Sequence, residues 1–208
     1  MLRPLSAALA LTLLSAPLAA EPTLFGNKVT MGTVADMPLT AAQKRTLAWY
    51  RSNKSYFGAF YVVPDTDHFF WTRNFHSLDT AKAAAKKGCE IVSEGKACAL
   101  YAVVYPQGTN PNARGVSGLS QPAAKDFQRR YPKQQKDGTY GAFAVNRSYS
   151  WGVSFGWKTK QEAEAAALSY CKAGSAIELA PLPIEGRKWV KAQGLEACRV
   201  VDVRAPSK

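Results

Sequence analysis

Acid–base chemistry could arise in one short stretch of this sequence. The chain has two histidines, and the segment D-T-D-H places the carboxylates of Asp65 and Asp67 beside the imidazole of His68. Together with His76, these side chains could form the acid–base cluster of a small hydrolase or a weak metal site. Asp and Thr in a hairpin turn also bond the backbone of the turn itself, and this structural role is the alternative.

Other catalytic groups do not stand out. The sequence has no phosphate-binding Gly-x-x-x-x-Gly-Lys loop, and no lysine can be singled out as a Schiff-base residue. The cysteines are explained more simply as disulfide partners than as nucleophiles. We therefore assign no catalytic residue, no metal site and no small-molecule cofactor, and expect a protein that is not an enzyme.

Residues 1–20 are typical of a secretory signal peptide. Arg3 supplies a positive charge, Leu5–Leu14 form an apolar segment, and Pro17 precedes the small pair Ala19 and Ala20. We predict cleavage after Ala20 and export to the periplasm or the medium. The alternative is a membrane anchor, for which the apolar stretch is short against the roughly 20 residues of a bilayer span. After cleavage we expect no transmembrane segment.

Export makes the cysteines informative. Four cysteines in an oxidising compartment predict two disulfides. The residues are Cys89, Cys98, Cys171 and Cys198. A metal site with four thiolates is the alternative, but the spacing lacks the short Cys-x-x-Cys pairs that such sites use.

The sequence also contains an internal duplication. The segment F-G-A-F-Y-V at Phe57–Val62 returns as Y-G-A-F-A-V at Tyr140–Val145. Further along, Phe75–Cys89 aligns without a gap with Trp157–Cys171, and all four alanines of each segment coincide. In this alignment His76 meets a lysine, so we expect that the fold does not require a histidine there.

Each copy divides into strand, strand, helix and strand. In copy two, Trp151–Trp157 alternates large apolar with small residues, which is typical of a strand with one buried face. The opposite face carries only small residues: Gly152, Ser154 and Gly156. Their lack of bulk predicts that the following helix packs closely against the strand. That helix begins after Ser77 in copy one and after Thr159 in copy two, both natural N-cap residues.

The sequence thus predicts an α+β fold of two tandem β-β-α-β repeats with antiparallel-rich sheets. Residues 21–38 form an N-terminal extension, 39–106 the first repeat, 107–118 a linker and 119–208 the second repeat. One disulfide within each repeat, Cys89–Cys98 and Cys171–Cys198, would join the helix end to the last strand, and exchanged pairing is the alternative. The strands could form one continuous sheet or two separate lobes.

A lead-in helix precedes the first strand of each repeat. Thr40 and Gln43 form a capping box in the first, and Ser120 and Pro122 are start signals in the second. The second repeat also has an insertion, residues 172–197, with no counterpart in the first. Such an insertion often carries the specific role of a protein, and a passive surface loop is the alternative.

The chain is strongly basic, with a formal net charge of +12 at pH 7, which favours association with anionic polymers or membrane surfaces. Two clusters are candidates for anion binding: Lys125, Arg129, Arg130, Lys133 and Lys136 on the second lead-in helix, and Lys82, Lys86 and Lys87 on the helix of copy one. Phe127 and Tyr131 are interleaved with the first cluster. The alternative is a solvated helix face with both aromatic rings turned into the core.

The repeated unit resembles a known domain. Its pattern, G-A-F followed by S-F-G-W, E-A, A-A-L and two cysteines, is similar to domain of unknown function 4189 of exported bacterial proteins. Copy two carries the pattern over Tyr140–Cys171, whereas copy one departs from it at Arg73 and His76. The resemblance implies an exported, disulfide-bearing α+β module with no established activity.

We therefore expect a non-enzymatic exported protein that binds an anionic envelope polymer or a protein partner. The first alternative is a small hydrolase that uses Asp65, Asp67, His68 or His76. The second is a protein inhibitor that contacts its target through residues 172–197, around Trp189.

Overall fold

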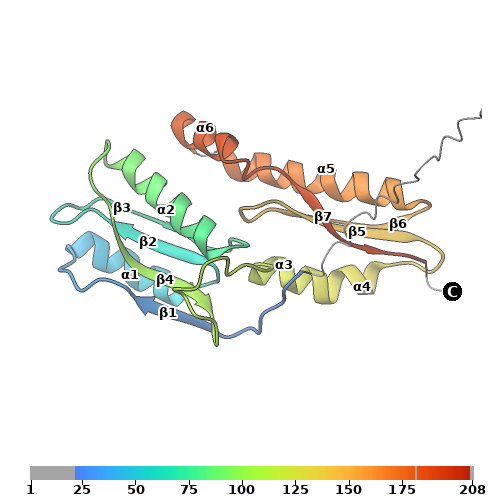
Figure 1. Ribbon diagram of the computed structural model, residues 1–208, viewed down its shortest axis with the longest axis horizontal. Coiled ribbons are helices and arrows are strands. Elements are labelled where there is room, and N and C mark those ends of the chain that lie inside the picture. The colour runs from blue at the N-terminus through green and yellow to red at the C-terminus, as the bar shows by residue number, and fades with distance from the viewer. Residues whose placement is uncertain (1–21, 181, 207–208) are drawn as a thin grey trace, which may run out of the picture.

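The computed structural model describes residues 22–180 and 182–206, so the predicted signal peptide lies outside the described part. The chain is an α+β structure with two antiparallel sheets. The sheets lie side by side, and each has helices on both of its faces (Figure 1). Of the two arrangements expected for the strands, two separate sheets is the one observed.

The first sheet has four strands in the order β1 (Val29–Thr33), β4 (Ala99–Pro106), β2 (Gly58–Val62) and β3 (Phe69–Thr72). Helix α1 (Ala41–Ser52) covers one face and helix α2 (Leu78–Val92) the other. Strand β1 was not predicted, because residues 21–38 were interpreted as an extension. It pairs with β4 over its whole length, so β4 and β2 are central and β3 is an edge strand.

Alternation along β2 explains why both faces of the first sheet are buried. Ala59 and Tyr61 pack on the side of α2, whereas Phe60 and Val62 pack on the side of α1. From α1, the hydroxyl of the fully buried Tyr50 donates a hydrogen bond to the backbone carbonyl oxygen of Thr72 in β3 at 2.9 Å. The central strand therefore belongs to two hydrophobic cores at once.

The second sheet has three strands in the order β6 (Trp151–Trp157), β5 (Tyr140–Val145) and β7 (Arg199–Arg204). Helix α5 (Lys160–Leu179) covers one face. The second lead-in helix covers the other, and it consists of α3 (Gln121–Lys125), a π-helical turn η1 (Asp126–Arg130) and α4 (Tyr131–Gln134). The predicted alternation of β6 is confirmed only at its start. Trp151 and Val153 pack on the side of the second lead-in helix, whereas Trp157 packs on the side of α5, beyond the register shift between β5 and β6.

The two predicted disulfides are confirmed. Cys89 at the end of α2 bonds Cys98 just before β4, and Cys171 in α5 bonds Cys198 just before β7. The Cα atoms are 6.2 Å apart in both pairs, within the usual range for a disulfide. Each bond therefore ties a helix to the start of the strand that follows it.

Three of the four predicted helix caps are confirmed. Thr40 and Thr159 each form a complete capping box, and the Ser77 hydroxyl accepts the backbone N–H of Thr80. Ser120 differs. It occupies the N-cap position of α3, but its hydroxyl is buried and has no hydrogen-bond partner within the described part of the chain.

In each half a hydroxyl of the sheet bonds both the neighbouring strand and the helix that packs on the sheet. Thr72 of β3 accepts the backbone N–H of Ala59 at 3.2 Å and donates to the carbonyl oxygen of Ala81 in α2 at 2.9 Å. Ser154 of β6 makes the same two bonds to the backbones of β5 and α5, at 3.1 and 2.6 Å. The helix position over each sheet is thus fixed at corresponding points.

At the point where the helix crosses the sheet, the second half has a glycine on the strand, whereas the first half has a glycine on the helix. In the second half, a Cβ atom on Gly152 would overlap the carbonyl oxygen of Ala167 and the backbone nitrogen of Cys171 in α5. The prediction that small residues allow a close approach is confirmed at this position. In the first half the glycine is on the helix instead, because Gly88 of α2 lies directly against the ring of Phe70.

The region 172–197, predicted as an insertion, is largely helical. Its first part belongs to α5, and its second part forms α6 (Ile184–Ala192), which packs against α2 of the first half. Pro183 precedes the first turn of α6, and Gly194, with φ of +60°, follows its end. Among the helices of residues 22–180 and 182–206, none is long and apolar enough to cross a membrane.

Candidate functional site

The structure does not bring the candidate hydrolase residues together. Asp65, Asp67 and His68 lie in the turn between β2 and β3, whereas His76 lies beyond the other end of β2, about 15 Å away at the usual rise per strand residue. The turn is held by Gln43, whose side-chain amide donates to three of its backbone carbonyl oxygens. In the described ranges no three His, Cys, Asp or Glu side chains gather as metal ligands would.

His76 joins the two halves of the molecule. Its Nδ1 accepts the backbone N–H of Ser120 at 3.0 Å, so Nε2 carries the proton and donates to the carbonyl oxygen of Ser150 at 3.2 Å. Its own backbone bonds the carbonyl oxygen of Ser148 and the N–H of Gly118. Burial lowers the pKa of His76 to about 4. The expectation that the fold does not require a histidine here is therefore wrong.

Ser154 needs separate mention because it lies in a Gly-x-Ser-x-Gly pattern, Gly152–Gly156, that sequence reasoning overlooked. In hydrolases this pattern places an exposed serine on a sharp turn between strand and helix. Here Ser154 is buried in the middle of β6 and donates to the carbonyl oxygen of Ala163. It is a structural hydroxyl and not a nucleophile.

The first basic cluster is exposed on the surface of α3, η1, α4 and the residues that follow α4. The side chains of Lys125, Arg129, Lys133 and Lys136 are all exposed, while Arg130 pairs with Asp126 at 3.8 Å. The interleaved aromatic residues Phe127 and Tyr131 pack against Phe143 in the core instead of lying among the cations. Any ligand on this face would therefore meet charge without aromatic stacking.

The second basic cluster is partly engaged within the protein. Lys82 donates to the carbonyl oxygen of Pro111 at 2.9 Å. Lys86 and Lys87 share the carboxylate of Glu90, at 3.6 and 3.9 Å. The stem of Lys87 also lines a cavity, which is a more specific feature than either cluster.

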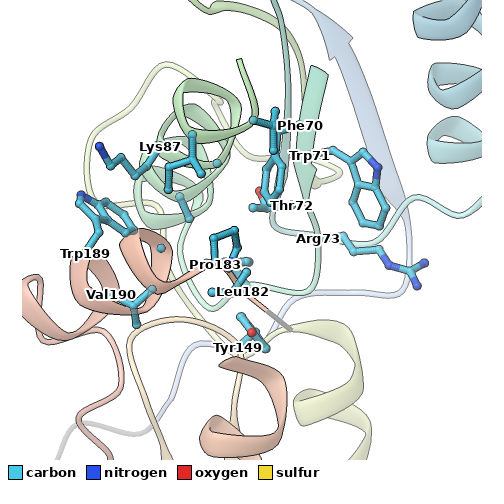
Figure 2. A pocket seen from close by; sticks show the side chains of 16 residues that line it. Phe70, Trp71, Thr72, Arg73, Lys87, Tyr149, Leu182, Pro183, Trp189 and Val190 are labelled. Carbon is cyan, nitrogen blue, oxygen red and sulfur yellow. The ribbon is translucent and has the colours of Figure 1, made fainter. Parts of the chain in front are cut away.

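This cavity, of about 250 Å³, lies between α2, α6 and strand β3 (Figure 2), and we call it the α2–α6 pocket. The wall from α2 includes Ala84, Gly88 and Ile91, which share one face of that helix. The ring of Phe70 forms the wall from the sheet, and Tyr149, from the loop between β5 and β6, lies at one end. Residues from both halves of the chain thus build the pocket together.

Helix α6 and the residues before it supply the remaining wall. Leu182, Pro183, Trp189 and Val190 line this side, and Figure 2 shows them facing Lys87 and Phe70. A Cβ atom on Gly186 would meet only side chains of the pocket wall, at 3.6 to 3.8 Å. Glycine at this position therefore keeps part of the pocket open.

Charged groups lie at the margin of the pocket. The guanidinium carbon of Arg73 lies 5.2 Å from the ring centre of Trp49 and 5.7 Å from that of Trp71, on the side of the strand away from α6 (Figure 2). Lys87 pairs with Glu90. Because the lining is mostly apolar and holds no acid–base pair or nucleophile, its chemistry suits the binding of an apolar group.

Glu178 of α5 provides a prediction about pH. Its Oε2 atom is buried without a hydrogen-bond partner among the described residues, and burial raises the pKa from 4.5 to about 7. The raised value in the folded state means that stability falls as pH rises from about 4.5 to about 7.

We therefore expect Glu178→Gln to increase the free energy of unfolding at pH 8 by about 1 kcal/mol, a value that allows for the partial exposure of the carboxyl. At pH 4 the substitution should have little effect, because the wild-type carboxyl is then protonated in both states. Urea unfolding at the two pH values measures the difference. An equal effect at both would contradict the burial argument.

Comparison of the chain with protein-family models, with curated proteins and with solved structures gave no match. The α2–α6 pocket was anticipated only through the expectation that residues 172–197 carry a specific role. Pro183 and Gly194 were signals from which α6 could have been predicted. The participation of Phe70 and Tyr149 had no local signal, because it depends on how the two halves pack.

Proposed function

We propose that this chain is an exported binding protein without catalytic activity, whose α2–α6 pocket receives a large apolar side chain of a protein partner. The observation that carries the proposal is the pocket itself. It is apolar, it combines residues of both halves, and helix α6 completes it from a region that only the second half possesses. A protein inhibitor acting through residues 172–197 would use the same surface.

The size of the pocket supports a side chain as the bound group. Its volume of about 250 Å³ lies above the roughly 150 Å³ of an apolar cavity that binds benzene. It lies below the roughly 300–1,000 Å³ of pockets for drug-sized ligands. Aromatic anchors inserted into pockets of this kind often dominate the binding energy of protein interfaces.

The pocket can be tested by filling it. We expect Gly186→Leu to weaken the binding of the apolar fluorescent probe N-phenyl-1-naphthylamine at least about tenfold, since the new side chain would occupy the cavity. The matched control is Lys188→Leu, which places the same side chain on the exposed side of α6. Titration of probe fluorescence measures both. Equal probe affinity for wild type and Gly186→Leu would refute the pocket.

We also propose that the two halves are copies of one unit. Support comes from the shared element order β-β-α-β, the matching strand orders β3-β2-β4 and β6-β5-β7, and one disulfide in each half. The bonds made by Thr72 and Ser154 correspond. In the first half a large strand residue, Phe70, lies against a glycine of the helix, Gly88. In the second half the glycine is on the strand, at Gly152, which fits two copies whose contacting residues changed size in compensation.

The proposal of export rests on the pattern of residues 1–20 and on the disulfides, because stable disulfides are typical of oxidising compartments. The resemblance of copy two to domain of unknown function 4189, which rests on the sequence pattern alone, also implies export. Edman sequencing of the protein secreted from a bacterial host would test the cleavage after Ala20, since the mature chain should then begin at Glu21.

A second candidate function is binding of an anionic envelope polymer by the first basic cluster, which the exposure of Arg129 and Lys133 favours. We expect Arg129→Glu with Lys133→Glu to elute from a dextran sulfate column at clearly lower salt than wild type, because phosphate or sulfate contacts are strongly salt dependent. Lys44→Glu with Arg45→Glu on α1 makes the same change in net charge elsewhere. If both double variants eluted at equally lowered salt concentrations, the retention would reflect only the net charge of the protein and not binding at the first basic cluster.

A further inference from the structure

We propose that the partner binds as an extended strand, antiparallel to the free edge of β3, and places one large apolar side chain in the α2–α6 pocket. The inference rests on the proposed function and specifies how the partner is recognised. Backbone hydrogen bonds to β3 would provide affinity, and the pocket would select the side chain, as in other cases where a peptide adds a strand to a sheet.

The first observation is that the pocket reaches the edge of the sheet. Four consecutive residues, Phe70–Arg73, line it, although neighbouring side chains of a strand point to opposite faces. The ring of Trp71 packs against Trp49 and Tyr50 on the α1 side, away from the pocket (Figure 2). Trp71 can therefore line the pocket only with its backbone, which places the cavity along the strand edge.

The second observation is the direction of the backbone groups of β3. In the adjoining turn, the N–H of Val63 donates to the carbonyl oxygen of His68 at 3.0 Å, and Phe70 lies opposite Tyr61 in the same register. Because bonded and non-bonded pairs alternate in antiparallel strands, Phe70 bonds toward β2 and Trp71 directs its N–H and C=O outward. Within the described residues, β2 is the only strand that pairs with β3.

The charge around this edge indicates the character of the partner. On α2, Lys86 and Lys87 share one carboxylate, and α6 carries three basic residues against one acidic residue in the sequence I-E-G-R-K-W-V-K-A. An extended segment with an apolar anchor and acidic flanking residues is complementary to this surface. An acyl chain could fill the pocket but would leave the outward peptide groups of β3 unused.

The geometry makes a specific prediction about the partner's backbone. In antiparallel pairing, the residue opposite Trp71 would direct its N–H and C=O toward β3, and its side chain would point toward α1. The next residue on either side would point its side chain into the pocket and its own N–H away from β3. The anchor residue therefore should not need its N–H, whereas the adjacent residue that faces Trp71 should.

The experiment uses short displayed peptides selected on the oxidised wild-type protein and counter-selected on Gly186→Leu. We expect selected peptides to combine one bulky apolar residue with acidic neighbours. In synthetic versions, N-methylation of the anchor residue should change affinity less than about threefold. N-methylation of the residue facing Trp71 should weaken binding at least about tenfold, because it removes a hydrogen-bond donor. Titration calorimetry measures both.

The outcomes separate the two proposals. If the peptides enriched on wild type before the counter-selection bind Gly186→Leu equally well, the pocket and with it the proposed function are refuted. If peptides require the pocket but N-methylation weakens binding equally at the anchor and at the residue facing Trp71, the proposed function stands and strand pairing is refuted. The reversed alternation would refute the antiparallel arrangement. Failure to select any pocket-dependent peptide would overturn a peptide partner, whatever the result with the apolar probe.

Discussion

Replacing Gly152 with alanine is expected to lower the free energy of unfolding by about 3 kcal/mol, the upper part of the range for overpacking a close-packed interior. A Cβ atom at this position would overlap the backbone of α5 at Ala167 and Cys171. Backbone atoms cannot turn aside as a flexible side chain can, and Cys171 is further fixed by its disulfide. The helix would have to move away from the sheet.

Urea unfolding of the oxidised protein measures this loss, and Gly26→Ala is the matched control. A Cβ atom at Gly26 meets nothing within 4 Å, so that substitution should change stability by less than about 0.5 kcal/mol. If the two variants were equally stable, α5 would not lie as close to β6 as the structure indicates. The Gly152→Ala change should also break the hydrogen bond from Ser154 to α5, because that bond spans the same space between β6 and the helix.

The second large effect is expected at His76. Its removal as His76→Ala would leave the N–H of Ser120 buried without its partner, and the carbonyl oxygen of Ser150 would lose one bond and keep the one from the backbone N–H of Asn146. Together with the lost packing, this should lower the free energy of unfolding by about 2–4 kcal/mol at pH 7.5. His68→Ala is the control, because that side chain lies in the β2–β3 turn, outside both cores.

The effect of His76 should also depend on pH. Its pKa is lowered in the folded protein from 6.5 to about 4, so between these values the unfolded chain binds more protons than the folded one. The stability that neutral His76 contributes is thus present above about pH 6.5 and is lost as pH falls toward 4. Wild type should lose stability by up to about 3 kcal/mol from this group over that interval. His76→Ala should not show this component, and parallel pH curves for the two proteins would contradict the assignment.

The parts of the fold that could be predicted are those with local signals. Thr159 and Glu162 predict the start of a helix by their spacing alone, and the alternation of large and small residues at the start of β6 predicts a strand. The disulfides followed from the placement of one cysteine in the helix of each copy and one at the start of its last strand. Strand β1 lacked such a signal, because V-T-M-G-T is short and owes its conformation to pairing with β4.

The site was less predictable for a physical reason. Phe70 and Tyr149 are ordinary apolar residues of a strand and a loop, and only the packing of α6 onto α2 makes them neighbours of one cavity. His76 was misjudged in the same way, since its alignment with a lysine suggested that the fold does not require a histidine there. Its burial comes from contact with the other half, which no pattern within one copy contains.

The bonds of His76 also have an evolutionary consequence. All four join it to backbone groups of the segments around Gly118, Ser120, Ser148 and Ser150, and none uses a partner's side chain. The contact itself therefore does not depend on which side chains stand at those four positions, provided that the main chain keeps its path. Among descendants of this gene we therefore expect this contact to constrain position 76 and loop length. Gly118 and Ser150 are constrained for separate reasons, because a Cβ atom on Gly118 would overlap the backbone of Thr23 and the Ser150 hydroxyl donates to the carbonyl oxygen of Cys171.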